Sequence, residues 1–225
     1  MVFVLVCTAI AAALSVGAKL AEKKLSLRPV SKTKRLCIIA VCGAIAAILH
    51  IFDFPVPFLA PGFYKLDFSE VPVMLCGFYL GPSATVLCEA LKILLKLVLK
   101  GTSTAFVGDF ANFAVGCSLV LPAAVIYHRK KSRKSAFIGL FSGTIILTVF
   151  GSAFNGTYLI PKFSDLYGIP LDAIVGMGTA INGNITSLWT LVLMSVAPLN
   201  LLKGVTVSAL TLLLYKKVAR PLFEK

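Results

Sequence analysis

The 225-residue sequence is 58% hydrophobic and 14% charged, with a mean hydropathy of +0.94. Apolar runs of this extent are too long for one soluble core to bury, so the composition predicts a polytopic, all-α membrane protein with about six or seven spans of roughly 20 residues. It excludes a soluble catalytic domain, because the spans use nearly all of the chain.

The net charge of +13 is concentrated in a few places. Most of the 22 Lys and Arg residues fall in three clusters beside apolar runs, at 19–35, 129–134 and 216–225. Such clusters mark the cytoplasmic side of a membrane protein and attract anionic lipid headgroups. They therefore predict membrane topology, with a cytoplasmic C-terminus, and no nucleic-acid partner.

The metal-binding residue types show no grouping. The six cysteines lie in apolar stretches without a CxxC pair, which is typical of small packing residues, and the two histidines stand apart. No metal site is expected.

The first apolar run covers residues 2–18 and is followed by the first basic cluster. A secretory signal carries its positive charge before the apolar run, so we favour an uncleaved membrane helix over a signal peptide. We therefore divide the chain into an extra N-terminal helix with a basic cytoplasmic linker, residues 1–30, and a membrane domain, residues 31–225.

The next span, 36–52, carries small residues at helical spacing. Ala40 pairs with Ala44, and Gly43 with Ala47. Such faces allow close helix–helix approach, and the partner is either inside this chain or in another subunit.

Residues 53–67 contain three prolines and four aromatic side chains, which forbid a continuous helix. Two interpretations stay open: a rigid lid over a planar ligand, or an interfacial aromatic belt.

Spans at 68–80 and 83–99 follow. The second carries Glu89, Lys92, Lys96 and Lys100 on one stripe. We expect this stripe to face a wet vestibule or a partner protein, with one Glu–Lys pair formed within the helix.

The span 107–127 begins with Asp109 and Asn112, three residues apart. Asp109 suits a first-turn cap, whereas Asn112 lies one turn deeper and is a candidate site residue.

The last two spans hold the polar residues that point most clearly to a site. Asn155 lies towards the outer end of 135–160, and Asn200 and Lys203 lie within 185–215, with a loop expected at 161–186. An amide and an ammonium at membrane depth predict a binding or transport site, the alternative being a snorkelling lysine beside a helix-capping asparagine.

With the basic clusters inside, the outer ends of these two spans reach similar depth, so Asn155 and Asn200 are expected in one outward-opening pocket. As one helix, 185–215 would extend roughly 47 Å, more than the bilayer core of about 30 Å. The charge rule favours one crossing with an outer extension over two spans.

Four blocks carry a resemblance to a known family: KLDFSEVPVMLCGFYLGP (65–82), GDFANFAVGCSLVLPAAVIY (108–127), FNGTYLIPKF (154–163) and APLNLLKGVTVSALTLLLYKKV (197–218). In this order they resemble the riboflavin-specific substrate-binding subunit, or S component, of energy-coupling-factor (ECF) vitamin transporters. The resemblance covers 36–218 and leaves residues 1–30 outside the usual six-helix form.

The resemblance implies a six-helix bundle in the cell membrane, not an enzyme, that binds riboflavin as its substrate under the loop between its first two helices. FMN is a second candidate ligand, and no cofactor is implied. It also implies two cytoplasmic ATPases and a transmembrane coupling subunit, which packs on the small-residue face of the first helix (Ala40, Gly43, Ala44, Ala47).

By motif match, Asn155, Asn200 and Lys203 fall at ring-contacting positions, and the Leu66 backbone contributes from the loop. Tyr64, Asp109 and Asn112 lie in matched segments without an assigned contact. The sequence itself has no G-x-x-x-x-G-K-[ST] loop for ATP, in keeping with separate ATPase subunits.

The chemistry agrees with this assignment. A flavin ring presents carbonyl acceptors and an imide N–H donor along one edge, which carboxamides and a lysine complement. The alternatives are an S component for another flavin or vitamin, a membrane enzyme using Asp109 or the Glu89–Lys92 pair, and a non-catalytic assembly partner whose polar residues only join helices.

Overall fold

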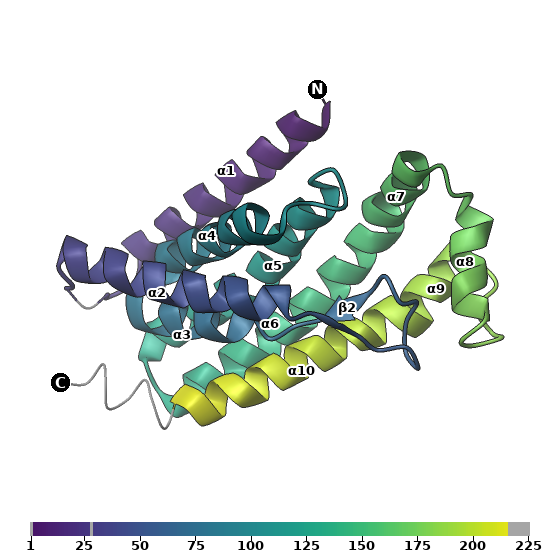
Figure 1. Cartoon of the computed structure of the whole chain (residues 1–225). Coiled ribbons are helices and arrows are strands. Elements are labelled where there is room, and N and C mark those ends of the chain that lie inside the picture. Colours follow the sequence, from purple (N-terminus) through teal and green to yellow (C-terminus); the bar gives the residue numbers. More distant parts are fainter. Residues whose placement is uncertain (1, 28, 216–225) are drawn as a thin grey trace.

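The computed structural model describes residues 2–27 and 29–215, so the basic cluster at 216–225 lies outside the described residues. The described chain is almost entirely helical. Its long helices run roughly along one direction and gather into a bundle (Figure 1). The bounds of the elements are α1 Val2–Lys23, α2 Lys32–Ile51, β1 Phe54–Pro55, β2 Lys65–Leu66, α3 Glu70–Leu80, α4 Pro82–Lys100, α5 Val107–Lys130, α6 Arg133–Phe154, α7 Ile160–Tyr167, α8 Leu171–Thr179, α9 Leu188–Leu191 and α10 Ala197–Leu214.

Two of the long helices contain a π-helical turn. The first, η1, covers Asn155–Leu159 and joins α6 to α7, and the second, η2, covers Val192–Val196 and joins α9 to α10. Four helical stretches are long and apolar enough to cross a membrane among the described residues: Lys32–Ile51, Val107–Lys130, Arg133–Tyr167 and Leu188–Leu214. The all-α, polytopic fold class is thereby confirmed.

Two glycines of α6 allow close packing against α5. A methyl group added at Gly139 would lie 2.8 Å from the Ala123 carbonyl oxygen of α5, and one at Gly143 would clash with the Leu119 carbonyl. Gly204 of α10 packs in the same way against Thr144. Small residues let helix backbones approach without a side chain between them, which is how membrane bundles gain packing energy.

The small-residue face of α2 divides in two. Gly43 and Ala47 are buried inside the chain, with Gly43 packed on Leu91 of α4, whereas Ala40 and Ala44 are exposed. Only Ala40 and Ala44 therefore remain available to a partner subunit.

The extra helix α1 packs against α4 and α5. At its end the Glu22 carboxylate accepts hydrogen bonds from the Ser83 backbone N–H (2.9 Å) and the Ser83 hydroxyl (2.7 Å), and it lies 3.7 Å from Arg35. Glu22 thus satisfies free N–H groups at the first turn of α4, a stabilising position for an acid.

In the second half of the chain one expectation is wrong, and one alternative that the sequence left open is excluded. The segment 161–186 was expected to be a loop, but most of it forms α7 and α8. Gly168, with φ +63°, ends α7, and Pro170 directly precedes α8, so these two residues mark helix boundaries within the segment. The helix from Leu188 to Leu214 also continues through Pro198, because a π-helical turn absorbs the missing N–H. Asn200 is therefore not a helix cap.

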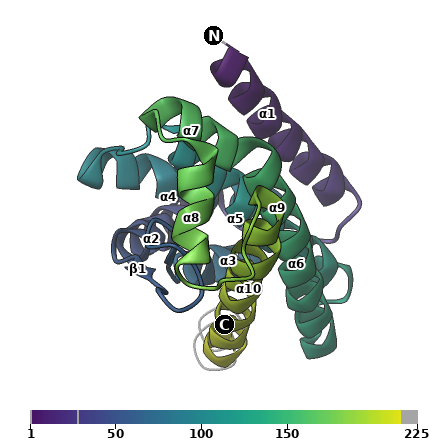
Figure 2. The same cartoon turned by 90° about the vertical axis from the view of Figure 1, so that its right-hand side faces the viewer.

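The chain connections separate the two ends of the bundle. One end carries the 52–69 loop, the 101–106 turn, α7, α8 and α9, and the other carries the links that follow α1 and α5 (Figures 1 and 2). In the loop, β1 and β2 pair antiparallel with Phe54 opposite Leu66, which folds the loop back over the bundle.

Candidate ligand-binding site

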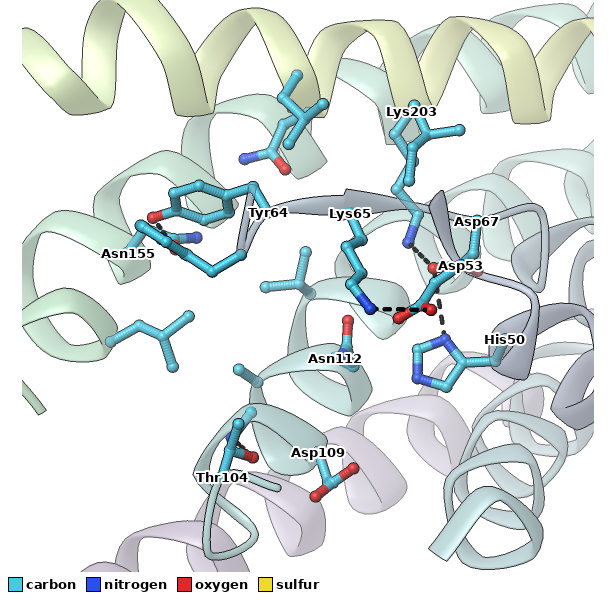
Figure 3. A pocket seen from close by; sticks show the side chains of 18 of the residues that line it. His50, Asp53, Tyr64, Lys65, Asp67, Thr104, Asp109, Asn112, Asn155 and Lys203 are labelled. Carbon is cyan, nitrogen blue, oxygen red and sulfur yellow. Dashed lines mark hydrogen bonds and ion pairs between the residues drawn. The ribbon is translucent and has the colours of Figure 1, made fainter. Parts of the chain in front are cut away.

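A cavity of about 250 Å³ lies at the loop end of the bundle, under the 52–69 loop and between α5, η1 and α10 (Figure 3). This is close to the lower end of the range of about 300–1,000 Å³ for small-molecule pockets. All seven residues proposed from the sequence line it: Tyr64, Leu66, Asp109, Asn112, Asn155, Asn200 and Lys203. The expected convergence of Asn155 with Asn200 is therefore present in the structure.

Asn155 is held by two hydrogen bonds. Its Nδ2 donates to the Gly151 carbonyl (2.7 Å), and its Oδ1 accepts from the Tyr64 hydroxyl (3.0 Å). The second bond ties the loop to η1, since Tyr64 belongs to the loop. Burial raises the pKa of the Tyr64 phenol, so this group stays a neutral donor.

Asn200 differs from Asn155 in having an unsatisfied donor. It is buried, and its Nδ2 has no hydrogen-bond partner among the described residues. A methyl group added at Gly151 would lie 2.8 Å from this nitrogen, so Gly151 leaves the space that the amide occupies. A buried donor without a partner costs about 1–3 kcal/mol, which a ligand carbonyl would recover.

The helix irregularities explain how these amides are placed. The π-helical turn at 155–159 begins at Asn155, and the one at 192–196 ends four residues before Asn200. Each is followed by a proline, Pro161 or Pro198, whose missing N–H and ring favour a wider turn. Such turns are frequent at functional sites because they redirect side chains.

Lys203 joins the cavity to a group of charged residues. Its Nζ lies 3.0 Å from Asp67 Oδ2 and 2.9 Å from Glu70 Oε1. Asp67 also lies 3.4 Å from His50 Nδ1 and accepts the Ser69 backbone N–H at 2.9 Å. Burial alone would raise the pKa of Asp67, but the attraction of Lys203 and the His50 contact outweigh it and hold that pKa well below its usual range.

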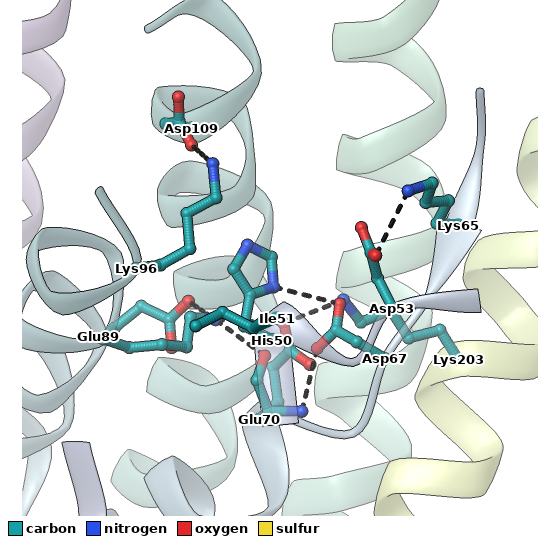
Figure 4. Close-up of polar contacts among 12 residues, drawn as sticks. His50, Ile51, Asp53, Lys65, Asp67, Glu70, Glu89, Lys96, Asp109 and Lys203 are labelled. Carbon is teal, nitrogen blue, oxygen red and sulfur yellow. Dashed lines mark hydrogen bonds and ion pairs between the residues drawn. The ribbon is translucent and has the colours of Figure 1, made fainter. Parts of the chain in front are cut away.

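The charged group continues below the cavity. Lys92 is fully buried, forms an ion pair with Glu89 of its own helix, and lies 3.4 Å from Glu70 Oε1 and 3.2 Å from the Ser69 hydroxyl (Figure 4). The predicted pair within the helix is confirmed. The expectation that Glu89 and Lys92 face a vestibule or a partner protein is wrong, because both side chains are fully buried inside the bundle.

Asp109 and Asn112 take different positions on α5. Asp109 accepts hydrogen bonds from Lys96 (2.5 Å) and the Thr102 hydroxyl (2.6 Å), so it fastens the 101–106 turn at the rim of the cavity. Asn112 lies one turn further along the cavity wall.

Leu66 is buried and packs beside Leu199. Its place in β2 brings the loop backbone to the cavity wall.

Sequence reasoning missed four residues of this region: His50, Asp67, Glu70 and Gly151. Asp67 and Glu70 stand in the block 65–82 that carries the resemblance, and a charge beside an apolar span was the available signal. Gly151 lies one helical turn before Asn155, and the only signal in the sequence was a small residue on the same helix face as Asn155.

The sequence profile described as "ECF transporter, substrate-specific component" matches residues 34–215. The chain belongs to this family. The match begins after α1, so it covers the six-helix part and leaves the extra helix outside.

Curated relatives and a solved structure agree with the family. Riboflavin transporter RibU of Staphylococcus aureus (strain TCH60) is 36% identical over 88% of this chain and 95% of its own length. Riboflavin transporter FmnP of Bacillus subtilis (strain 168) is 29% identical over 86% of this chain and 96% of its own length.

The solved S component of a bacterial ECF transporter aligns with a TM-score of 0.66 at 35% identity, covering 85% of this chain and 99% of that one. The expected family and fold are confirmed. Since the family is a transporter's substrate-specific component, the expectation of a non-enzyme is confirmed as well.

Proposed function

We propose that this chain is the riboflavin-binding subunit of an ECF-type uptake transporter in the cell membrane. Riboflavin is the transported substrate, no cofactor is required, and a coupling transmembrane subunit and two ATPases supply the energy. The family assignment and the two riboflavin-transporter relatives support this function.

The observation that carries the proposal is the meeting of two amides and an ammonium in one cavity. Asn155, Asn200 and Lys203 line the same cavity from η1 and α10. Together they offer donors and an acceptor to the carbonyl and imide edge of a flavin ring. Apolar wall residues such as Leu159, Leu199 and Phe163 suit the faces of the ring.

The 52–69 loop acts as the lid of this site. Tyr64 fastens it to Asn155, and Asp67 fastens it to Lys203. Both fastening partners are proposed ligand contacts, so ligand entry requires these hydrogen bonds to open or rearrange.

The membrane orientation places the cavity outside. The basic cluster at 129–134 follows α5 at the end of the bundle opposite the loop, and this end is cytoplasmic by the positive-inside rule. The C-terminus is cytoplasmic for the same reason. The exposed Ala40 and Ala44 of α2 form the contact with the coupling subunit, and α1 is retained as an extra membrane helix that packs against α4 and α5.

The test is a riboflavin titration of the purified protein, followed by quenching of flavin fluorescence. We expect saturable binding by the chain alone, and accumulation of riboflavin in vesicles only when the ATPases, the coupling subunit and ATP are present. FMN is titrated in parallel to define the ligand range. Absence of riboflavin quenching would overturn the proposal, and accumulation by the chain alone would overturn the role of the partners.

A further inference from the structure

Beneath the cavity, five charged side chains alternate in sign. The order of contacts is Glu89, Lys92, Glu70, Lys203 and Asp67, with His50 beside Asp67 (Figure 4). Only Lys203, Asp67 and His50 line the cavity, whereas Glu70, Glu89 and Lys92 lie behind it. The three residues behind the cavity do not line it, so we expect any effect they have on binding to pass through Lys203 or Asp67.

Glu70 links the two lysines. One atom, Glu70 Oε1, lies 2.9 Å from Lys203 Nζ and 3.4 Å from Lys92 Nζ, and the Glu70 side chain is 2% exposed. Lys92 in turn is held by Glu89 and by the Ser69 hydroxyl. Lys92 therefore fixes the position of the oxygen that Lys203 contacts.

The donor count of Lys203 follows from these contacts. An ammonium has three N–H donors and no acceptor. Asp67 and Glu70 occupy two of them, which leaves one N–H for a ligand in the cavity. The two carboxylates also compensate the lysine's charge, so the remaining donor suits a neutral carbonyl better than an anion.

We propose that Glu70 is a positioning residue for ligand binding: held by Lys92, it fixes the Lys203 ammonium so that its third N–H meets a carbonyl oxygen of the bound ring. The proposal rests on the proposed function, since it assigns a role to a residue behind the same site. It adds a residue that contacts no ligand and yet sets the affinity for a neutral ring edge.

Glu89 provides a matched control. Glu70 and Glu89 are both buried carboxylates, and each is one of the two that pair with Lys92. Glu70→Met and Glu89→Met therefore remove the same charge from Lys92 at similar volume, but only Glu70→Met removes a partner of Lys203. A general loss of bundle stability would affect both variants alike.

The experiment measures the Kd for riboflavin of the purified full chain by fluorescence quenching. We expect Glu70→Met to raise Kd by about tenfold or more, and Glu89→Met by less than about threefold. Glu70→Gln keeps an oxygen at the shared position and is expected to restore most of the affinity. In a Lys203→Met background, Glu70→Met is expected to have no further effect, because the group it positions is absent.

Several results would overturn the proposal. Equal losses in Glu70→Met and Glu89→Met, no loss in Glu70→Met, or a full loss that persists in the Lys203→Met background would each show that Glu70 does not act through Lys203. If Glu70→Met does not fold, Glu70→Asp is used, because it shortens the side chain by one methylene and draws the carboxylate away from Lys203. Glu89→Asp is then its control, and the same comparison of Kd values applies. A wild-type chain that does not bind riboflavin would instead overturn the proposed function, and this inference with it.

Discussion

Two polar regions meet at the cavity, and they differ in whether their groups are neutral or charged and in how those groups are paired. On one side, Asn200 keeps a buried donor without a partner among the described residues, and Asn155 has one donor and one acceptor engaged. On the other side, the ammonium groups of Lys92, which is buried, and of Lys203, which is partly buried, each contact two carboxylates. The amide side leaves a neutral donor for a ligand, whereas the charged side balances its charges with residues of this chain and leaves one N–H of Lys203 for a ligand.

The comparison explains why both regions can exist inside one apolar bundle. A buried charge must be paired, because its desolvation costs several kcal/mol, but a neutral amide tolerates one missing hydrogen bond at a cost of about 1–3 kcal/mol. Binding energy is therefore available from the amides at moderate cost to stability. The ion pairs instead anchor α3, α4, α10 and the loop around the cavity.

The largest expected effect comes from breaking the charged side. Lys92→Met leaves Glu70 and Glu89 buried without their shared cation, and we expect the free energy of unfolding to fall by about 3–5 kcal/mol. Thermal unfolding in detergent measures this effect. Lys100→Met is the control, since Lys100 pairs with Asp53 at the surface and such pairs contribute about 0–1 kcal/mol. Equal melting temperatures for the two variants would contradict the claim that the buried ion pairs of Lys92 stabilise the bundle more than a surface pair does.

On the amide side, Asn200→Ala should separate binding from stability. It removes a donor that has no partner among the residues that the structure describes, so we expect little change in melting temperature. We also expect a loss of about 1–3 kcal/mol in riboflavin binding, roughly 5- to 150-fold in Kd. Flavin fluorescence quenching and ligand-free unfolding are measured on the same sample. A destabilised variant with unchanged Kd would reverse the roles given to the two regions.

How far the sequence predicts this site depends on which helix supplies each partner. Asn155, Asn200 and Lys203 were recognisable because each polar side chain interrupts an apolar run, and membrane depth makes such residues functional by default. The Glu89–Lys92 pair was recognisable because residues three apart share a helix face. The pairing of Lys203 with Glu70 and Asp67 could not be recognised in the sequence. The helical period relates residues within one helix and gives no information about contacts between α10 and either α3 or the loop.

The local backbone illustrates the same limit. Glycine and aspartate made 161–186 look like a loop, yet Gly168 serves as the C-terminal cap of α7 and Asp172 lies in the first turn of α8. At Pro198, a π-helical turn just before the proline lets the helix continue past it. In both cases the residue type marks a helix irregularity, and packing decides whether the helix ends there.

A smaller and more selective effect is expected at Gly151. The added methyl of Gly151→Ala would lie 2.8 Å from Asn200 Nδ2 and 3.4 Å from a Val115 methyl, so the amide must shift. We expect Kd for riboflavin to rise by about three- to tenfold. Alanine favours a helix by up to about 1 kcal/mol over glycine, so stability should not fall. Gly176→Ala, at an open position in α8, is the control, and an equal change of Kd in both variants would contradict the close contact between Gly151 and Asn200.

The smallest expected effect concerns the fastening of the loop on the amide side. Tyr64→Phe removes one neutral hydrogen bond to Asn155 Oδ1 and keeps the aromatic packing on Phe63, so we expect a cost of about 0.5–1.5 kcal/mol. The loss should appear as faster riboflavin release in stopped-flow quenching, because a loop held less firmly opens more often. Tyr167→Phe is the matched control, since it loses a hydrogen bond from α7 to the Ser103 carbonyl and its own side chain does not line the cavity. Release accelerated equally in both variants would mean that general loosening of the loop end, and not the Tyr64 hydroxyl, governs the exit of the ligand.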